Sequence, residues 1–227
     1  MATAAYTMDL AEIIEEAFER ASGGTRELRS GYDYKTAKRS LNMLMMEWAN
    51  RGLNLWTFEE GSQALAKGDG EYTMPADTVD LIEFYIRQNE GTSGQTDLAM
   101  SRVSVSTHAA IPNKLVQGRP TQVFVQRSTA APVVHVWPLP DNDNYKLIYW
   151  RLRRIQDAGA TGADVMDVPF RFVPAMVAGL AFHIAQKIPQ GEQRAVLLGQ
   201  AYEAAFSLAA DEDRDRSTVR FVPRVRR

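Results

Sequence analysis

Three histidines are the residues of this sequence whose type best suits metal binding. His108, His135 and His183 fall in different predicted elements, and none has the H-x-x-x-H or H-E-x-x-H spacing that places two imidazoles on one face of a helix. The chain has no cysteine, which excludes thiolate zinc sites, disulfides and cysteine nucleophiles together. We therefore predict no metal site and no cofactor, and we interpret His183 as a residue on the flank of a helix.

Paired carboxylates are the next chemistry to consider, because two of them can serve as the acid and the nucleophile of a glycoside hydrolase. The candidates are Glu59 with Glu60 and Asp141 with Asp143. The distance between the carboxyl groups in space decides that chemistry, and spacing along the chain does not fix it. Nothing else in the sequence selects these residues. We interpret them as solvated strand or loop residues and predict no catalytic site.

The sequence contains neither a phosphate-binding loop nor a nucleophilic serine of the usual pattern. The glycine-containing stretch Gly91–Thr96 lacks the lysine of a phosphate-binding loop, and no apolar strand leading to a helix frames it. The serines lie outside any G-x-S-x-G elbow. These observations disfavour nucleotide binding and serine hydrolysis.

The stretch Tyr149–Arg154 mixes two aromatic residues with three arginines, a combination that could stack on single-stranded nucleic acid. The alternation from Tyr145 to Arg153 favours a different interpretation, a strand with one buried and one solvated face. The net charge of −2 also argues against a protein whose main task is gripping phosphates. A nucleic-acid-binding module would show strongly salt-dependent binding, which separates the two interpretations.

The C-terminal stretch changes from acidic to basic. It begins with four acidic residues, and its last nine residues interleave four arginines with apolar side chains. Three interpretations are open: a nucleic-acid contact, a disordered terminus, or an arm that orders on a protein partner. We favour the arm, because apolar anchors combined with charge-assisted hydrogen bonds are expected where a tail binds another protein.

The elements that would position these residues begin with two helices. We predict helices over residues 8–21 and 34–50, where apolar residues recur at three- and four-residue spacing. Asp9 and Glu12 have capping-box spacing at the start of the first helix, which the glycine pair at 23 and 24 closes. Gly52 suits the left-handed position after the second helix. The two helices form a hairpin whose apolar stripes need further helices to cover them.

The region from residue 53 to residue 157 is predicted to be β-rich, because strand-like runs alternate with turns and six of the ten prolines fall there. A hairpin is predicted at Gly68-Asp69-Gly70, between the first two strands. Residues 90–119 have no clean period, and we expect mixed structure with a loop there. The expected strands are Trp56–Leu65, Glu71–Met74, Thr78–Gln88, Thr121–Arg127, Val133–Val136 and Tyr145–Leu152.

Helical patterning returns in the last third of the chain. We predict a helix over residues 169–187, capped by Asp167 or Val168, with Pro174 close enough to the start to be tolerated. A last helix is predicted over residues 190–210, and its many alanines allow close approach to a neighbouring helix. Its apolar stripe is expected to comprise Val196 or Leu197 together with Leu198, Ala201, Tyr202, Ala205, Phe206 and Ala209.

The predicted fold class is α+β: a discontinuous helical bundle of two N-terminal and two C-terminal helices, with an inserted β-rich domain and an extended C-terminal arm. The expected parts are residues 1–52 and 158–211 for the two halves of the bundle, 53–157 for the β-rich insertion and 212–227 for the arm. No segment approaches the roughly 18 apolar residues that span a bilayer, and the N-terminus lacks the pattern of a targeting signal. We expect a soluble protein that is not an enzyme.

Several short blocks, in the same order along the chain, resemble the head-to-tail adaptor (connector) proteins of podoviruses, a family related to tail tubular protein A. They extend from about residue 37 to residue 210 and consist of structural residues rather than chemically distinctive ones. The blocks are Leu41-Asn42, Glu47–Trp56, Tyr72–Asp80, Gly118–Thr121, Trp137–Asp141 and Asp167–Phe172.

The resemblance implies a structural virion protein in the neck of a short-tailed bacteriophage, assembled in the host cytoplasm and serving DNA ejection. Such adaptors form a ring, usually of twelve copies, that lines the DNA passage between the portal and the tail nozzle. The implied partners are further copies of the chain, the portal protein, the nozzle protein and often a tail fibre, with DNA only as passing cargo and no membrane. A virion-associated cell-wall hydrolase using the paired carboxylates is the alternative function.

The resemblance also assigns a role to the end of the chain. In related adaptors the C-terminal segment reaches the portal, so we expect the same of the corresponding residues here. The expected portal-binding residues are Val219, Arg220, Phe221, Val222, Arg224, Val225, Arg226 and Arg227.

Overall fold

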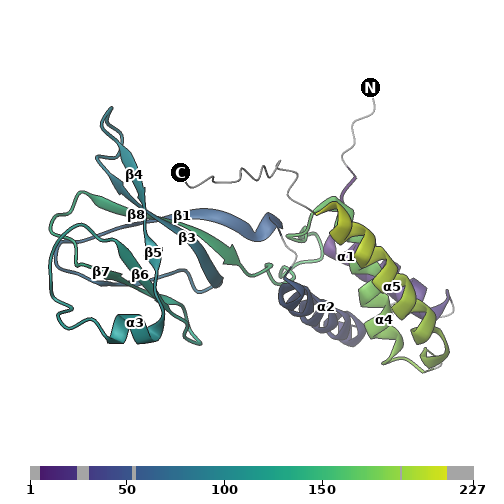
Figure 1. The fold of residues 1–227 in the computed structure, drawn as a ribbon. Coiled ribbons are helices and arrows are strands. Elements are labelled where there is room, and N and C mark those ends of the chain that lie inside the picture. The colour runs from purple at the N-terminus through teal and green to yellow at the C-terminus, as the bar shows by residue number, and fades with distance from the viewer. Residues whose placement is uncertain (1–5, 25–30, 53–54, 190, 214–227) are drawn as a thin grey trace, which may run out of the picture. The chain divides into compact units, whose positions relative to one another are not determined.

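The computed structural model describes residues 6–24, 31–52, 55–189 and 191–213. Within these ranges the chain is mixed α+β, as predicted, with five α-helices and two β-sheets (Figure 1). The chain divides into two compact units. Residues 1–55 and 155–227 belong to the first, here called the helical unit, and Trp56–Arg154 form the second, the β unit. No helix in the described part of the chain is both long enough and apolar enough to cross a membrane.

The helical unit is organised around one buried helix. Its helices are α1 (Leu10–Ser22), α2 (Gly31–Arg51), α4 (Val173–Ala185) and α5 (Glu192–Glu212). Most residues of α4 are buried, and this helix packs against each of the other three. Gly179 permits the close packing, because a Cβ there would lie only 2.9 Å from Tyr202 on α5 and 3.0 Å from Leu44 on α2.

Local signals fix the start of α1 and the C-terminal ends of α1 and α2, as predicted. The Asp9 carboxylate accepts a hydrogen bond from the Glu12 N–H at 2.8 Å, and the Glu12 carboxylate accepts one from the Asp9 N–H at 3.1 Å. This reciprocal capping box satisfies two N–H groups that a helix start leaves unpaired. Gly23 follows α1 with φ of 68°, and Gly52 follows α2 with φ of 72°, the left-handed conformation that glycine adopts without strain.

The start of α4 differs from the prediction. A 3-10 turn, η2 (Phe170–Phe172), precedes the helix, which begins at Val173 without a side-chain cap. The prediction that Asp167 or Val168 caps this helix is therefore wrong. The Asp167 carboxylate instead accepts a hydrogen bond from the Gln156 N–H at 3.3 Å. Pro174 in the first turn compensates for the missing side-chain cap, because its fixed φ suits a helix start and its missing N–H needs no partner.

The inner face of α5 completes the core of the helical unit. Trp48 on α2 is fully buried, and its indole N–H donates to the Tyr202 hydroxyl at 2.9 Å. Its ring lies 5.5 Å from that of Phe172 and 5.4 Å from that of Phe206 between ring centroids. Tilted contacts of this kind between aromatic rings stabilise a core beyond the area they bury.

The β unit is a sandwich of two four-stranded sheets. One sheet has the order β1-β8-β3-β4, and the other has the order β2-β7-β6-β5. All pairs are antiparallel except β5 with β6. The elements are η1 (Leu55–Thr57), β1 (Phe58–Ala64), β2 (Glu71–Thr73), β3 (Thr78–Gln88), β4 (Thr96–Ala99), β5 (Ser101–Arg102), α3 (Val105–Ala109), β6 (Gln122–Gln126), β7 (Val133–Trp137) and β8 (Tyr145–Arg153), of which η1 begins at the last residue of the helical unit.

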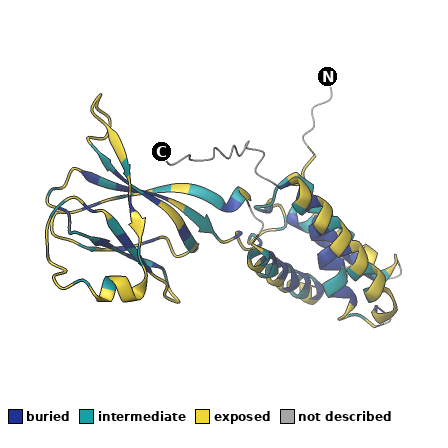
Figure 2. Cartoon of the chain, in the orientation of Figure 1, coloured by how far each residue is buried: buried dark blue, intermediate teal, exposed yellow. Residues whose placement is uncertain are grey.

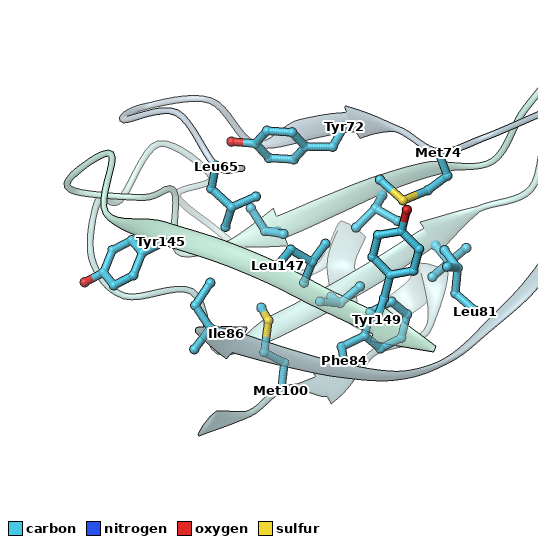
Figure 3. Packing of buried hydrophobic residues seen from close by; sticks show 14 residues of the cluster. Leu65, Tyr72, Met74, Leu81, Phe84, Ile86, Met100, Tyr145, Leu147 and Tyr149 are labelled. Carbon is cyan, nitrogen blue, oxygen red and sulfur yellow. The ribbon is translucent and has the colours of Figure 1, made fainter. Parts of the chain in front are cut away.

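Side chains from both sheets fill the core of the sandwich (Figure 3). Alternate residues of the strands point inward, as the period of two along a strand requires. Leu147 and Tyr149 on β8 meet Val123 of β6 and Val134 of β7 in one cluster. Residues 90–119, expected to have mixed structure, contain β4, β5 and α3.

The predicted hairpin at Gly68-Asp69-Gly70 is wrong. β1 pairs with β8, and β2 pairs with β7, so the turn carries the chain from one sheet to the other. Tyr72 holds the turn, because its hydroxyl accepts from the Ala66 N–H and donates to the Asp69 carbonyl, both at 3.0 Å. The turn residues suit both a hairpin within one sheet and a connection between two sheets. Only the long-range partners of the two strands decide between these arrangements.

Candidate interaction surfaces

The acidic residues proposed as a hydrolase pair do not converge. Glu59 accepts hydrogen bonds from Arg151 at one end of β8, 2.6 Å from its Nε, whereas Asp143 accepts from the Lys67 N–H at 2.6 Å near the other end. Glu59 is five residues from Ala64, the last residue of β1, so at about 3.3 Å per residue roughly 17 Å of strand backbone separates it from the end of the sheet near Asp143. A glycosidase needs its two carboxyl groups within about 10 Å.

Within each proposed pair the side chains also serve local structure. Glu59 and Glu60 are successive strand residues, so their side chains point to opposite faces of the sheet. Asp141 is exposed and accepts a hydrogen bond from the neighbouring Asn142 amide at 2.7 Å. These contacts fit the interpretation of solvated strand and loop residues.

The basic and aromatic stretch belongs to a strand, as we interpreted it. Desolvation on burial lowers the pKa of Arg151, but hydrogen bonds to Asp77 and Glu59 outweigh it and leave the pKa raised. The Arg151 side chain is 11% exposed, and its Nη1 lies 2.6 Å from an oxygen of Asp77. Tyr149 is buried in the sandwich core. Arg151 and Tyr149 therefore serve the structure of the β unit, whereas Trp150 and Arg154 of the same stretch are exposed.

Strict alternation along β8 was a wrong expectation. Leu147, Ile148 and Tyr149 are buried in succession, and Trp150 is 41% exposed. The reason is the central position of β8, which lies between β1 and β3, so that cross-strand neighbours such as Tyr85 cover part of its outer face. Buried and exposed side chains therefore alternate only where one face of the strand is open to solvent.

The three histidines lie in two separate places. In the β unit, His108 of α3 stacks on Phe124 with ring centroids 4.9 Å apart, and His135 lies 5.5 Å from both rings. In the helical unit, His183 Nε2 lies 3.7 Å from a carboxylate oxygen of Glu47. Within the described residues, no group of three or more histidine, aspartate or glutamate side chains is arranged to hold a metal ion.

An apolar groove lies in the helical unit, along α1 and the start of α4. Its volume is about 830 Å³. Phe170 and Val165 line it and are 78% and 65% exposed, which is unusual for large apolar side chains. Glu16 and Arg20, also in the lining, form an ion pair at 2.7 Å. The remaining lining residues are Tyr6, Thr7, Met8, Ile13, Met166, Val168, Val173, Pro174, Met176 and Val177.

A second apolar surface lies on the outward face of α5. The expectation that Val196 or Leu197 belongs to the inner stripe is wrong, because the two side chains are 68% and 67% exposed. Ala201, expected in the same stripe, is exposed as well. Leu208 is 71% exposed on the same helix, and Figure 2 shows exposed positions along the length of α5. The inner face is formed instead by Tyr202 and Phe206 with Ala209. Helix α5 thus has two apolar faces, and one chain covers only one of them.

The end of α5 is fixed by a buried carboxylate that the sequence did not reveal. The Asp213 side chain is fully buried, accepts a hydrogen bond from the Leu55 N–H at 3.0 Å and forms an ion pair with Arg171. This contact ties the start of η1, the 3-10 turn before α4 and the end of α5 together. One signal could have suggested it: three consecutive acidic residues at a helix C-terminus oppose the helix dipole, so a cation is needed nearby.

The predicted portal-binding residues Val219–Arg227 lie outside the described residues. A family model described as SU10 adaptor protein matches residues 8–227, which includes both units and the C-terminal stretch. A comparison with curated proteins finds no match.

Proposed function

The chain belongs to the SU10 adaptor protein family, a family of phage head-to-tail adaptors, and from that premise we propose that it forms a ring between the portal and the tail nozzle. As a member of this family the chain is a structural adaptor and a component of the virion, where it associates with other virion components. The proposed ring has twelve copies, lines the DNA passage and anchors the nozzle and a tail fibre. The family match over nearly the whole chain is the observation that carries the proposal.

Apolar surfaces of the helical unit support assembly. The groove beside α1 and the outer face of α5 leave large apolar side chains in contact with water in the single chain. Exposed apolar patches of this kind mark surfaces where proteins associate. A ring needs two different patches on each subunit, because each copy contacts its two neighbours through non-identical surfaces.

The residues Val219–Arg227 are proposed to form the portal-binding arm. Two observations support this role: the family match extends through them, and Asp213, six residues before Val219, is held in place by Leu55 and Arg171. The arm would thus depart from a fixed point at Asp213. Its arginines would form charge-assisted hydrogen bonds with portal carboxylates, while its valines and phenylalanine fill apolar sites.

The proposed domain arrangement is a discontinuous helical bundle, residues 1–52 and 158–211, with residues 53–157 inserted as a β-rich domain and 212–227 as the arm. Support comes from the two compact units, each with its own hydrophobic core. A fragment containing only Trp56–Arg154 should therefore fold, with dispersed amide signals in an NMR spectrum. A collapsed or unfolded fragment would count against the insertion.

The test of the ring is negative-stain imaging with mass measurement of the purified chain, alone and mixed with the portal protein of the same phage. We expect rings, or a symmetric collar on the portal. Removal of residues 219–227 should weaken attachment to the portal and leave the unfolding transition unchanged. A matched control replaces exposed Lys114 and Arg119 of the β unit with glutamine, which should leave attachment intact. A monomer indifferent to the portal would overturn the proposal.

The alternative of a cell-wall hydrolase is open to a direct test. We infer that the chain has no such activity, because its candidate carboxylates are separated and engaged in local contacts. Addition of the chain to a peptidoglycan suspension should leave the turbidity unchanged. Clearing that disappears in Glu59→Gln or Asp143→Asn would establish the enzyme.

A further inference from the structure

Helix α5 has an outward apolar stripe with the spacing of a coiled-coil seam. Leu197, Ala201, Ala204 and Leu208 follow one another at steps of four, three and four residues, and all four are exposed. Steps of three and four place side chains on one face of a helix and repeat in a heptad. The stripe is therefore a ready surface for one more helix, with two large residues at its ends and two small residues between them.

Helix α2 has an exposed stripe with the same steps. Arg39, Met43, Met46 and Asn50 are exposed at intervals of four, three and four residues. Met43 and Met46 are 58% and 50% exposed, whereas the adjacent Met45 is 2% exposed in the core. The middle of this stripe has two large flexible side chains where the stripe on α5 has two alanines. Methionine fills irregular gaps well, so the two stripes are complementary in size.

The geometry points to α2 of one copy packing against α5 of the next copy, as the contact between neighbouring subunits of the proposed ring. This inference rests on the proposed function, and it names the surfaces that close the ring. The contact is heterologous, because two different helices of one chain take part. Repetition of such a contact produces a closed ring where the rotation between copies closes on itself.

Charge decides the orientation of the two helices. Exposed Lys35 and Arg39 make the first half of α2 basic, and α5 ends in exposed acidic residues, Asp211 and Glu212. An antiparallel arrangement brings the basic half of α2 to the acidic end of α5. A parallel arrangement would bring it to the start of α5, where exposed Glu192 and Arg194 offset each other and offer no net attraction. The antiparallel arrangement is therefore favoured.

The antiparallel arrangement defines four layers across the contact. Met46 packs on Ala201 and Met43 packs on Ala204, so a large residue meets a small one in both central layers. Asn50 faces Leu197 at one end. At the other end the methylene groups of Arg39 cover Leu208 while the guanidinium stays in water. Each apolar residue of one stripe thus has a partner in the other.

The cysteine-free sequence allows a direct test by disulfide cross-linking of the full chain. The double variant Asn50→Cys/Leu197→Cys joins the two stripes at facing positions in the antiparallel arrangement. Asn50→Cys/Leu208→Cys is the matched control, because Leu208 is eleven residues further along α5, about 16 Å away. Both variants are assembled alone or on the portal, oxidised, and separated by non-reducing electrophoresis, while mass measurement reports whether rings are present.

We expect a ladder of cross-linked species up to the closed ring from the first variant and monomers from the control. A ladder from the control alone would show a parallel contact and overturn the proposed pairing. Rings that form but give no ladder with either pair would overturn the contact and leave the proposed function standing. A chain that forms neither rings nor a collar on the portal would overturn the proposed function, and the contact with it.

A second experiment tests the contact without cysteines, by introducing one charge and then a compensating charge. Ala204→Glu places a carboxylate opposite Met43 and should prevent ring formation, while the unfolding midpoint stays unchanged because Ala204 is exposed. Adding Met43→Lys should restore rings, since the lysine of one copy then meets the glutamate of the next. Rings that tolerate Ala204→Glu alone, in a chain of unchanged fold, would contradict the contact.

Discussion

The helical unit packs three aromatic residues around Trp48, whereas the β unit packs side chains from two facing sheets into one cluster. Trp48 is fully buried in the helical unit and contacts Phe172, Phe206 and Tyr202. In the β unit the core consists of fourteen side chains from both sheets, and Trp150 on β8 is 41% exposed. Trp48 thus connects α2 with η2 and α5 from a fully buried position, whereas Trp150 lies at the surface of the sandwich.

The same contrast appears in the surfaces. The helical unit leaves a groove and the outer face of α5 apolar, and the ion pair Glu16–Arg20 lies beside the groove. The outer sheet surface of the β unit instead joins strands by charges, as in the pair Arg87–Asp97 at 2.7 Å across β3 and β4. Exposed ion pairs contribute little stability but keep a sheet surface soluble. The β unit exposes apolar side chains as well, among them Leu115 at 78% and Ile82 at 46%, so the surfaces alone do not assign assembly to the helical unit.

Substitution of the two tryptophans should give the largest difference between the units. Trp48→Ala leaves a cavity and removes the hydrogen bond to Tyr202, and should cost about 3–5 kcal/mol of unfolding free energy. Trp150→Ala, at a half-exposed position, should cost less than about 1 kcal/mol. Urea unfolding followed by circular dichroism measures both. Equal losses would contradict the view that the burial of Trp48 in its aromatic cluster causes the difference.

The buried ion pairs should give the next largest difference. Asp213→Ala leaves Arg171 without its carboxylate and the Leu55 N–H without its acceptor, at a cost of about 2–3 kcal/mol. Asp77→Ala in the β unit should cost less, about 1 kcal/mol, because Arg151 keeps Glu59.

A conservative variant separates charge from geometry at this site. Asp213→Asn can still accept a hydrogen bond from the Leu55 N–H through its amide oxygen. Its loss of unfolding free energy should therefore be smaller than that of the alanine variant and greater than zero. Urea unfolding under the same conditions gives the comparison. If the asparagine and alanine variants lose the same free energy, the ion pair with Arg171 carries the whole effect.

How far the sequence predicts this fold depends on the range of each signal. The capping box of Asp9 and Glu12 and the left-handed Gly23 and Gly52 were predictable, because neighbours within a few residues determine them. The positions of β1, β2, β3, β6, β7 and β8 followed from local patterning, whereas β4 and β5 were not predicted. The pairing of β1 with β8 was not predictable, because partners about ninety residues apart along the chain decide it.

The exposure of side chains on α5 and the role of Asp213 likewise depend on partners that are distant in the sequence. Helix α5 has apolar residues on two faces, and the sequence cannot say which face its own core covers, so Val196 or Leu197 was expected inside. Asp213 looked like one acidic residue of a solvated tail, yet its role depends on Arg171, which is forty-two residues away. The absence of converging carboxylates likewise became visible only with the strand register.

The smallest expected difference between the units is a pH effect from one histidine in each. Desolvation lowers the pKa of His183, with Lys187 acting in the same direction and Glu47 opposing it. Desolvation also lowers the pKa of His108, assisted by the charges of His135 and Lys114.

A histidine whose folded pKa lies below 6.5 binds fewer protons in the folded chain than in the unfolded chain. Its contribution to stability is therefore complete above pH 6.5 and is lost as the pH falls from there towards the folded pKa. Urea midpoints measured about one pH unit above and below 6.5 should show this decline. His183→Gln should remove the part that belongs to the helical unit, and His108→Gln the part that belongs to the β unit. Aspartates such as Asp80, whose pKa is lowered from 3.8, lose their contribution to stability only at more acidic pH. A decline of the urea midpoint near pH 6.5 that remains in both variants would therefore show that these histidines do not cause it.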